Sequence, residues 1–198
     1  TEQGWVMREW APNATDIFLI GNFSEWKENT KYRFSKLKNG VWELKLKTGE
    51  IKHLDLYKLS MHWNGGHGER IPAWATRVVQ DEKTYIFSAQ VWSPSRPYKF
   101  KKKKFKPQIS PLLIYECHIG MAQEEERIGS YNEFREKILP RIAKDGYNAI
   151  QIMAIQEHPY YGSFGYHVSS FFAPSSRFGT PDELKQLIDE AHASGIAV

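Results

Sequence analysis

The fold is decided by two stretches of sequence, Leu112-Leu-Ile-Tyr115 and Ala149-Ile-Gln-Ile-Met-Ala-Ile155. Each is an almost continuous apolar run, which is typical of a parallel strand whose sheet is covered on both faces. Parallel neighbours need a long crossover between them, and a helix usually supplies it. We therefore expect a helix between the two runs and an α/β arrangement around them.

A helix between the runs is indicated by the capping box Ser130-Tyr-Asn-Glu133, whose end residues satisfy each other's free backbone donors. Phe134, Ile138 and Ile142 follow at helical spacing and share one face. Gly146 then ends the helix just before the second run. The predicted order up to this point is strand, helix, strand.

The pattern continues with a second helix and a third strand. Thr180-Pro-Asp-Glu183 is another capping box, with proline at the first helical position. The apolar side of this helix consists of Leu184, Leu187, Ile188 and Ala191. Gly195 ends it, and Ile196-Ala-Val198 has the composition of a strand start. Alternating strands and helices predict a parallel α/β fold.

The region before residue 93 has a different composition, because it holds all seven tryptophans. Short strand candidates are separated by turn signals, and Asn39-Gly40 is the strongest of these signals. Beyond that turn, Trp42, Leu44 and Leu46 alternate with charged residues, as in a strand with one wet face. Several such strands predict a small β-sandwich, to which we assign residues 1–98.

The net charge of 27 − 23 = +4 is a local feature of a predicted basic linker, residues 99–110. The stretch contains Lys99, Lys101, Lys102, Lys103, Lys104 and Lys106. Without these six lysines the chain carries 21 − 23 = −2. Prolines and like charges disfavour packed structure, so a solvated linker or a charged edge strand is expected. A polyanion site is the alternative, but Phe100 and Phe105 flank the run instead of interleaving with it.

Membrane insertion is not expected, because no apolar run approaches the roughly 20 residues that a spanning helix needs. Cys117 is the single cysteine, which excludes an internal disulfide and fits a reducing compartment. No positively charged start leads into an apolar stretch. We therefore expect a cytoplasmic protein.

A long connection from Gln156 to Gly179 separates the second strand from the second helix. Such connections usually have 2–6 residues, and long ones tend to be functional. The aromatic residues in it are Tyr160, Tyr161, Phe164, Tyr166, Phe171, Phe172 and Phe178. Aromatic faces combined with hydrogen-bonding groups suit sugars, because a pyranose ring has an apolar face and a polar rim.

Several of these motifs resemble known families. Trp10-Ala-Pro-Asn-Ala14 with Phe18-Leu-Ile-Gly-Asn-Phe-Ser-Glu-Trp26 resembles a family 48 carbohydrate-binding module. Further segments resemble the glycogen branching enzymes of glycoside hydrolase family 13, in particular their eukaryotic-type subgroup. They are Tyr115-Glu-Cys-His-Ile-Gly120, Gln151-Ile-Met-Ala-Ile-Gln-Glu-His158, Ser163-Phe-Gly-Tyr-His167 and Phe171-Phe-Ala-Pro-Ser-Ser-Arg-Phe-Gly-Thr-Pro181. The likeness extends over nearly the whole chain.

The resemblance implies a multidomain fold, an immunoglobulin-like β-sandwich followed by the first three strands of a (β/α)8 TIM barrel over residues 111–198. It implies cleavage of α-1,4-glucan and transfer to a 6-hydroxyl to form α-1,6 branches, by the retaining two-carboxylate scheme. The three catalytic carboxylates of the family match no position here, so this chain alone is expected to be inactive. Glycogen or another α-1,4-glucan is the expected partner, with no cofactor, metal or nucleic acid, and the full-length protein is expected to be a monomer.

Eight residues are carried over as candidate substrate contacts. Tyr166 matches the family's tyrosine that stacks on the sugar ring at the cleavage point, and His167 lies beside it. In the sandwich, the family binds oligosaccharide at the segment that corresponds to Trp10, Ala11 and Pro12, and at the turn that corresponds to Lys38, Asn39 and Gly40.

Other readings of these residues have less support. Glu116, His118, His158 and His167 could be metal ligands, although structural hydrogen bonding explains them better. Glu116 and Glu157 could be a catalytic carboxylate pair, but the resemblance places the chemistry elsewhere. Three functions stay open: part of a branching enzyme, a standalone glucan-binding module without catalysis, and a polyanion-binding protein.

Overall fold

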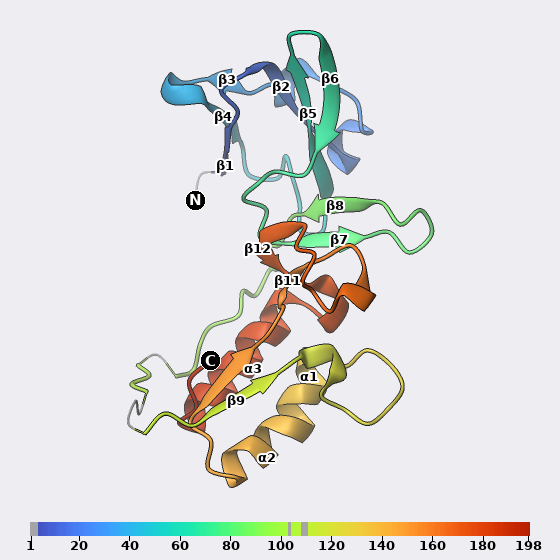
Figure 1. Cartoon of the computed structure of the whole chain (residues 1–198). Helices are drawn as coiled ribbons and strands as arrows, with labels where there is room; N and C mark the ends of the chain where they lie inside the picture. The colour runs from blue at the N-terminus through green and yellow to red at the C-terminus, as the bar shows by residue number, and fades with distance from the viewer. Residues whose placement is uncertain (1–3, 103, 108–110) are drawn as a thin grey trace. The chain divides into compact units, whose positions relative to one another are not determined.

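The computed structural model describes residues 4–102, 104–107 and 111–198 (Figure 1). The first three residues of the predicted sandwich, and Lys103 with residues 108–110 of the predicted linker, lie outside the described residues. The chain divides into two compact units. One spans residues 1–95 and 170–173, and the other spans 96–169 and 174–198.

The first unit is a β-sandwich made of two antiparallel sheets. Its strands are β1 (Trp5–Trp10), β2 (Ala14–Gly21), β3 (Ser35–Lys36), β4 (Val41–Leu46), β5 (Leu56–Trp63), β6 (Gly66–Arg70), β7 (Val78–Gln80) and β8 (Phe87–Gln90). One sheet has the order β1-β4-β3, and the other has the order β2-β5-β8-β7, with β6 also paired to β5. The predicted sandwich region is thus built from antiparallel β-strands.

The core of the sandwich is filled by residues from both sheets. Trp42, Leu44 and Leu46 on β4 are buried, as the alternating pattern predicts, and face Leu19 on β2 and Leu59 on β5. The buried indole of Trp42 donates a hydrogen bond to the carbonyl of Ala11 at 3.0 Å, so its only polar atom is satisfied.

The second unit contains parallel strands and helices. Its elements are β9 (Ile114–Cys117), α1 (Tyr131–Glu133), α2 (Leu139–Lys144), β10 (Ala149–Ile152), β11 (Gln156–Glu157) and α3 (Pro181–Ala193), and β12 (Ser170–Pro174) is shared with the first unit. β9 and β10 pair in parallel, and a single parallel bridge joins Ala149 to Ala197. The predicted third strand is therefore present only as this bridge.

Both predicted capping boxes are confirmed. Ser130 and Glu133 exchange backbone and side-chain bonds before α1, and Thr180 and Glu183 do so before α3. The helix that starts at Tyr131 is not uniformly α, because Phe134–Ile138 forms a π-helical turn. Pro140 follows that turn, and its missing N–H removes the bond that an α-helix would make to the carbonyl of Glu136.

The predicted basic linker is anchored to α3 rather than free. The carboxylate of Asp189, which is 2% exposed, accepts bonds from the Tyr98 hydroxyl at 2.7 Å and from the amides of Lys101 and Lys102 at 2.7 and 2.8 Å. Farther along, the ring of Phe105 stacks on His192 with centroids 4.1 Å apart. Like charge favours a solvated segment here, but a buried acceptor on the helix holds its backbone in place.

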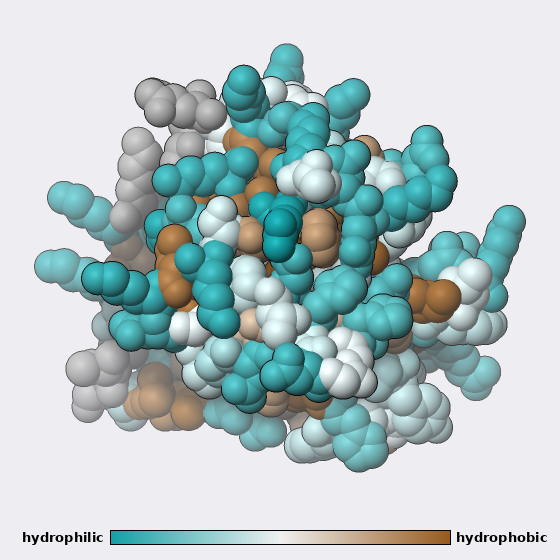
Figure 2. Space-filling view, turned by 90° about the horizontal axis from the view of Figure 1, so that it is seen from above, coloured by the Kyte–Doolittle hydropathy of each residue, from teal (hydrophilic) through white to brown (hydrophobic). Residues whose placement is uncertain are grey.

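The face seen in Figure 2 is largely hydrophilic, and hydrophobic side chains emerge on it in separate patches. Among the described residues, no helix combines the length and the apolar character that crossing a bilayer requires.

Candidate functional site

The candidate residues of the sandwich are brought together where β1 ends and β4 begins. Trp10 pairs with Val41, and the amide of Ala11 donates to the carbonyl of Gly40 at 2.8 Å. Asn39 and Gly40 have φ of 59° and 75°, which is the left-handed geometry that an Asn-Gly turn supplies at low cost. A side chain on Gly40 would place its Cβ 2.8 Å from Pro12, so glycine is required for this close approach.

The Trp10 ring is anchored by one hydrogen bond and stays open to solvent. Its indole N–H donates to the carbonyl of Asn39 at 3.1 Å, while 62% of the residue remains exposed. The turn's backbone acceptors are already engaged, since the carbonyl of Gly40 receives Ala11 and that of Lys38 receives Val41. The Trp10 ring and the side chains of the turn are therefore what this corner offers to a ligand.

A hollow of about 450 Å³ lies beside Trp10, and we call it the Trp10 groove. It is lined by Glu9, Trp10, Ala11, Pro12, Asn13, Ala14, Met61, His62, Trp63, Arg70 and Ala73. Trp63 at the end of β5 is 46% exposed, and a Cβ on Gly66 would lie 3.1 Å from its Nε1. The glycines of β6 thus leave room for a second aromatic face, which no sequence motif indicated.

A charged pair forms part of the wall of the Trp10 groove. Arg70 donates to the Glu9 carboxylate at 2.6 Å, and the amide of Ala73 donates to the same carboxylate at 3.3 Å. Burial raises the pKa of Glu9, and Arg70 opposes that shift. Because Glu9 is only 2% exposed, Arg70, whose side chain is 44% exposed, is the partner that can reach a ligand.

A second hollow of the sandwich, of about 770 Å³, contains Trp26 and Lys58. The Lys58 ammonium lies 5.9 Å from the centre of the Trp26 ring and 3.2 Å from Glu69. Glu25 and Trp26 both have positive φ, 52° and 59°, which is uncommon for such residues and concentrates at ligand sites. The signal in the sequence was the Gly21-to-Trp26 motif itself, for which no binding role was predicted.

In the second unit, Tyr166 projects from a tight turn. The Ser163 hydroxyl donates to the carbonyl of Tyr160 at 2.7 Å, and the amide of Tyr166 donates to the carbonyl of Ser163 at 3.0 Å. Gly165 has φ of 82°, and a Cβ there would lie 2.4 Å from the carbonyl oxygen of Ala154. The turn leaves Tyr166 72% exposed, and His167 beside it is exposed as well.

Glu157 has a structural environment, not a catalytic one. It is completely buried, and its carboxylate accepts bonds from the amide and hydroxyl of Ser176 at 2.7 and 2.8 Å and from Arg177 at 3.2 Å. A carboxylate so enclosed cannot contact a substrate. Pairing Glu157 with Glu116 as acid and nucleophile is therefore excluded by geometry.

His118 and His158 pack against aromatic rings of the long connection 156–179, which we call the aromatic loop. The His118 ring lies edge-on to Tyr161, Phe164 and Phe178, with centroids 5.5–6.2 Å away. Burial, and after it the neighbouring His158, lower the pKa of His118. No three His, Cys, Asp or Glu side chains within the described part of the chain are arranged to hold a metal ion.

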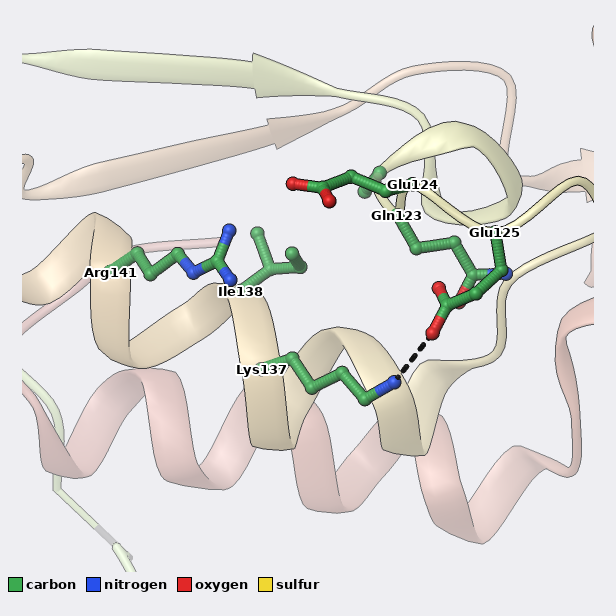
Figure 3. Close-up of a pocket in the computed structure, with 7 residues that line it drawn as sticks. Gln123, Glu124, Glu125, Lys137, Ile138 and Arg141 are labelled. Atoms are coloured by element: carbon green, nitrogen blue, oxygen red, sulfur yellow. Dashed lines mark hydrogen bonds and ion pairs between the residues drawn. The ribbon is translucent and has the colours of Figure 1, made fainter.

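A third hollow, of about 420 Å³, lies beside the π-helical turn of the second unit (Figure 3). Figure 3 shows Lys137 joined to Glu125, a contact of 3.1 Å, with Arg141 and Glu124 lying apart from that pair. Its lining residues include no aromatic ring. This hollow therefore lacks the stacking surface that the other two offer.

Comparison with known proteins defines the class. Residues 1–75 match the family model "Carbohydrate-binding module 48 (Isoamylase N-terminal domain)". Among solved structures, a putative alpha amylase from Salmonella typhimurium has a TM-score of 0.79 at 21% identity, covering 99% of this chain and 30% of that one. A pullulanase from Bacillus acidopullulyticus has a TM-score of 0.79 at 19% identity, covering 99% and 28%. The chain thus shares its fold with a part of each of these two structures.

The closer sequence relatives are 1,4-alpha-glucan-branching enzymes. That of Rhizophagus irregularis is 47% identical over 98% of this chain, that of Eremothecium gossypii 45% over 96%, and that of Dictyostelium discoideum 42% over all of it. The chain covers 29–30% of the length of these relatives. It is therefore related to the N-terminal part of the branching enzymes, as the sequence motifs predicted.

Proposed function

We propose that this chain is the glucan-binding module and the beginning of the catalytic domain of a 1,4-alpha-glucan branching enzyme. The observation that carries the proposal is 42–47% identity to enzymes of that name over nearly the whole chain. The parent protein cleaves an α-1,4 bond through a covalent glycosyl-enzyme and transfers the segment to a 6-hydroxyl of an acceptor chain.

The parallel strands of the second unit support the start of a (β/α)8 barrel. Such a barrel takes roughly 250 residues and carries its active site at the carboxyl ends of the strands. Tyr166 lies in the long connection that follows the carboxyl end of β10. In the proposed enzyme, Tyr166 stacks on the sugar at the cleavage point and His167 lies beside it, while the acid, the nucleophile and the third carboxylate come from other strands.

The sandwich is proposed to hold the glucan chain at two surfaces. The Trp10 groove offers two exposed indoles and a reachable guanidinium, and the hollow of Trp26 offers an indole beside an ammonium group. An aromatic face packs against the C–H face of a pyranose, while the charged groups bond its hydroxyl rim. Binding here raises the local concentration of substrate for the catalytic domain.

Trp10→Ala is expected to weaken the retention of the chain on insoluble glycogen roughly 30-fold, which corresponds to about 2 kcal/mol. The reason is that an indole already anchored by a hydrogen bond provides stacking area at a reduced ordering cost. The measurement is a glycogen pull-down over a protein concentration series. Trp74→Ala is the matched control, because Trp74 is also 62% exposed and does not line the groove. Equal loss in both variants would contradict a specific role for Trp10.

The proposed function is tested by expressing the longer protein and the 198-residue chain in parallel and measuring branching by iodine staining. The longer protein is expected to form branches and the chain alone to form none, while both are retained by glycogen. A pure chain that forms branches would show that the catalytic carboxylates lie within it. Retention on heparin but not on glycogen, at moderate salt, would favour the polyanion-binding alternative.

A further inference from the structure

We propose that Glu157 and Arg177 are positioning residues that join the two ends of the aromatic loop to each other and thereby hold Tyr166 in place. The inference rests on the proposed function for its catalytic consequence, but its structural part concerns the loop alone. The loop runs between the end of β10 and the start of α3, and Tyr166 is one of its most exposed side chains.

The Glu157 carboxylate accepts hydrogen bonds from residues at the far end of the loop. Besides the amide and hydroxyl of Ser176, it accepts the hydroxyl of Ser175 at 3.3 Å, and on its own side the amide of His158 at 3.1 Å. All of these donors are buried or partly buried with it. Loss of the carboxylate would leave several inward-pointing donors unpaired at once.

The Arg177 guanidinium donates hydrogen bonds to residues at the near end of the loop. Its Nη1 bonds the Glu157 carboxylate at 3.2 Å and also the carbonyl of His158, and its Nη2 bonds the carbonyl of Pro159 at 3.0 Å. The planar guanidinium therefore links three consecutive residues, 157–159, to Arg177, which lies 18 to 20 residues later in the chain. A lysine can preserve the charge but not this set of simultaneous bonds.

We call the contacts of Glu157 and Arg177 the clamp. Further hydrogen bonds connect this clamp to Tyr166. Ser169 closes a smaller loop by donating its amide and hydroxyl to the carbonyl of Glu157 at 2.9 and 3.1 Å. Beyond Pro159, the carbonyl of Tyr160 accepts the Ser163 hydroxyl, and Ser163 in turn accepts the amide of Tyr166. The position of the exposed ring thus depends on a clamp that never touches the substrate.

Arg177→Lys in the longer protein tests this inference, with Arg135→Lys as the matched control. Arg135 is also mostly buried, at 15% side-chain exposure, and pairs with Glu190 at 2.9 Å on α3. Arg177→Lys is expected to speed amide hydrogen exchange across residues 160–169 roughly tenfold and to leave α3 unchanged. It is also expected to lower kcat about tenfold with little change in glycogen affinity, because misplacement of a contact residue acts on the reaction step.

The two readouts separate the possible failures. Unchanged exchange in residues 160–169 would overturn the clamp, whatever the activity. Faster exchange with unchanged kcat would overturn the positioning role while leaving the proposed function intact. A longer protein without branching activity would overturn the proposed function, and the exchange result would then decide the clamp. If Arg177→Lys fails to fold, Ser176→Ala, which removes one donor to Glu157, is expected to give the same pattern at smaller amplitude.

Discussion

Tyr166→Ala is expected to lower the branching turnover of the longer protein about 100-fold while changing its affinity for glycogen less than about twofold. The ring is 72% exposed, so its removal leaves no cavity in the core. The affinity is expected to persist because the sandwich carries the two indole-lined surfaces at which glycogen is proposed to bind. A side chain that orients the sugar at the cleavage point acts on the chemical step instead.

The measurement is initial branching rate against glycogen concentration, accompanied by a glycogen pull-down. Tyr166→Phe retains the ring and is expected to recover most of the rate, because stacking needs the aromatic face and not the hydroxyl. Tyr160→Ala is the control within the same loop, since Tyr160 is 67% exposed. Turnover that survives Tyr166→Ala, or falls equally in Tyr160→Ala, would contradict the assigned role.

Local signals predicted much of the fold. The capping boxes at Ser130 and Thr180 fixed both helix starts, because a cap is satisfied by residues only three positions apart. The alternation around Trp42 and Leu44 predicted the buried face of β4, since a strand repeats every two residues. In each case the information that determines the structure lies within a few residues.

Features that depend on distant contacts were not predicted. Glu157 looks like a carboxylate available at a strand end, but Ser176 and Arg177 enclose it from about 20 residues away. Trp63 reads as one more strand aromatic, and only the glycines of β6 make it a wall of the Trp10 groove. The lysine run reads as a linker because nothing in it reveals an acceptor on α3.

Asp189, the acceptor on α3, gives the second large effect, which is a loss of stability. Asp189→Ala is expected to lower the free energy of unfolding of the second unit by about 2–4 kcal/mol, because three donors lose one buried partner together. The hydroxyl of Tyr98 is one of them, and burial, reinforced by its bond to Asp189, raises the pKa of that tyrosine to about 12. The denaturant midpoint measures the loss. Asp145→Ala is the control, because this substitution removes the same charge from an exposed residue at the end of α2.

The same carboxylate makes the unit sensitive to acid. Burial alone would raise the pKa of Asp189, but the amides of Lys101 and Lys102 and the Tyr98 hydroxyl outweigh it, so the pKa lies below its ordinary value. A carboxylate whose pKa is lower in the folded state stabilises the fold above the ordinary value of about 4 and loses that contribution as the pH falls through the folded pKa. Asp189→Asn cannot titrate there, so its stability is expected to fall less steeply between about pH 5 and pH 3. Parallel pH curves for Asp189→Asn and the unaltered chain would show that Asp189 does not anchor the lysine segment through its charge.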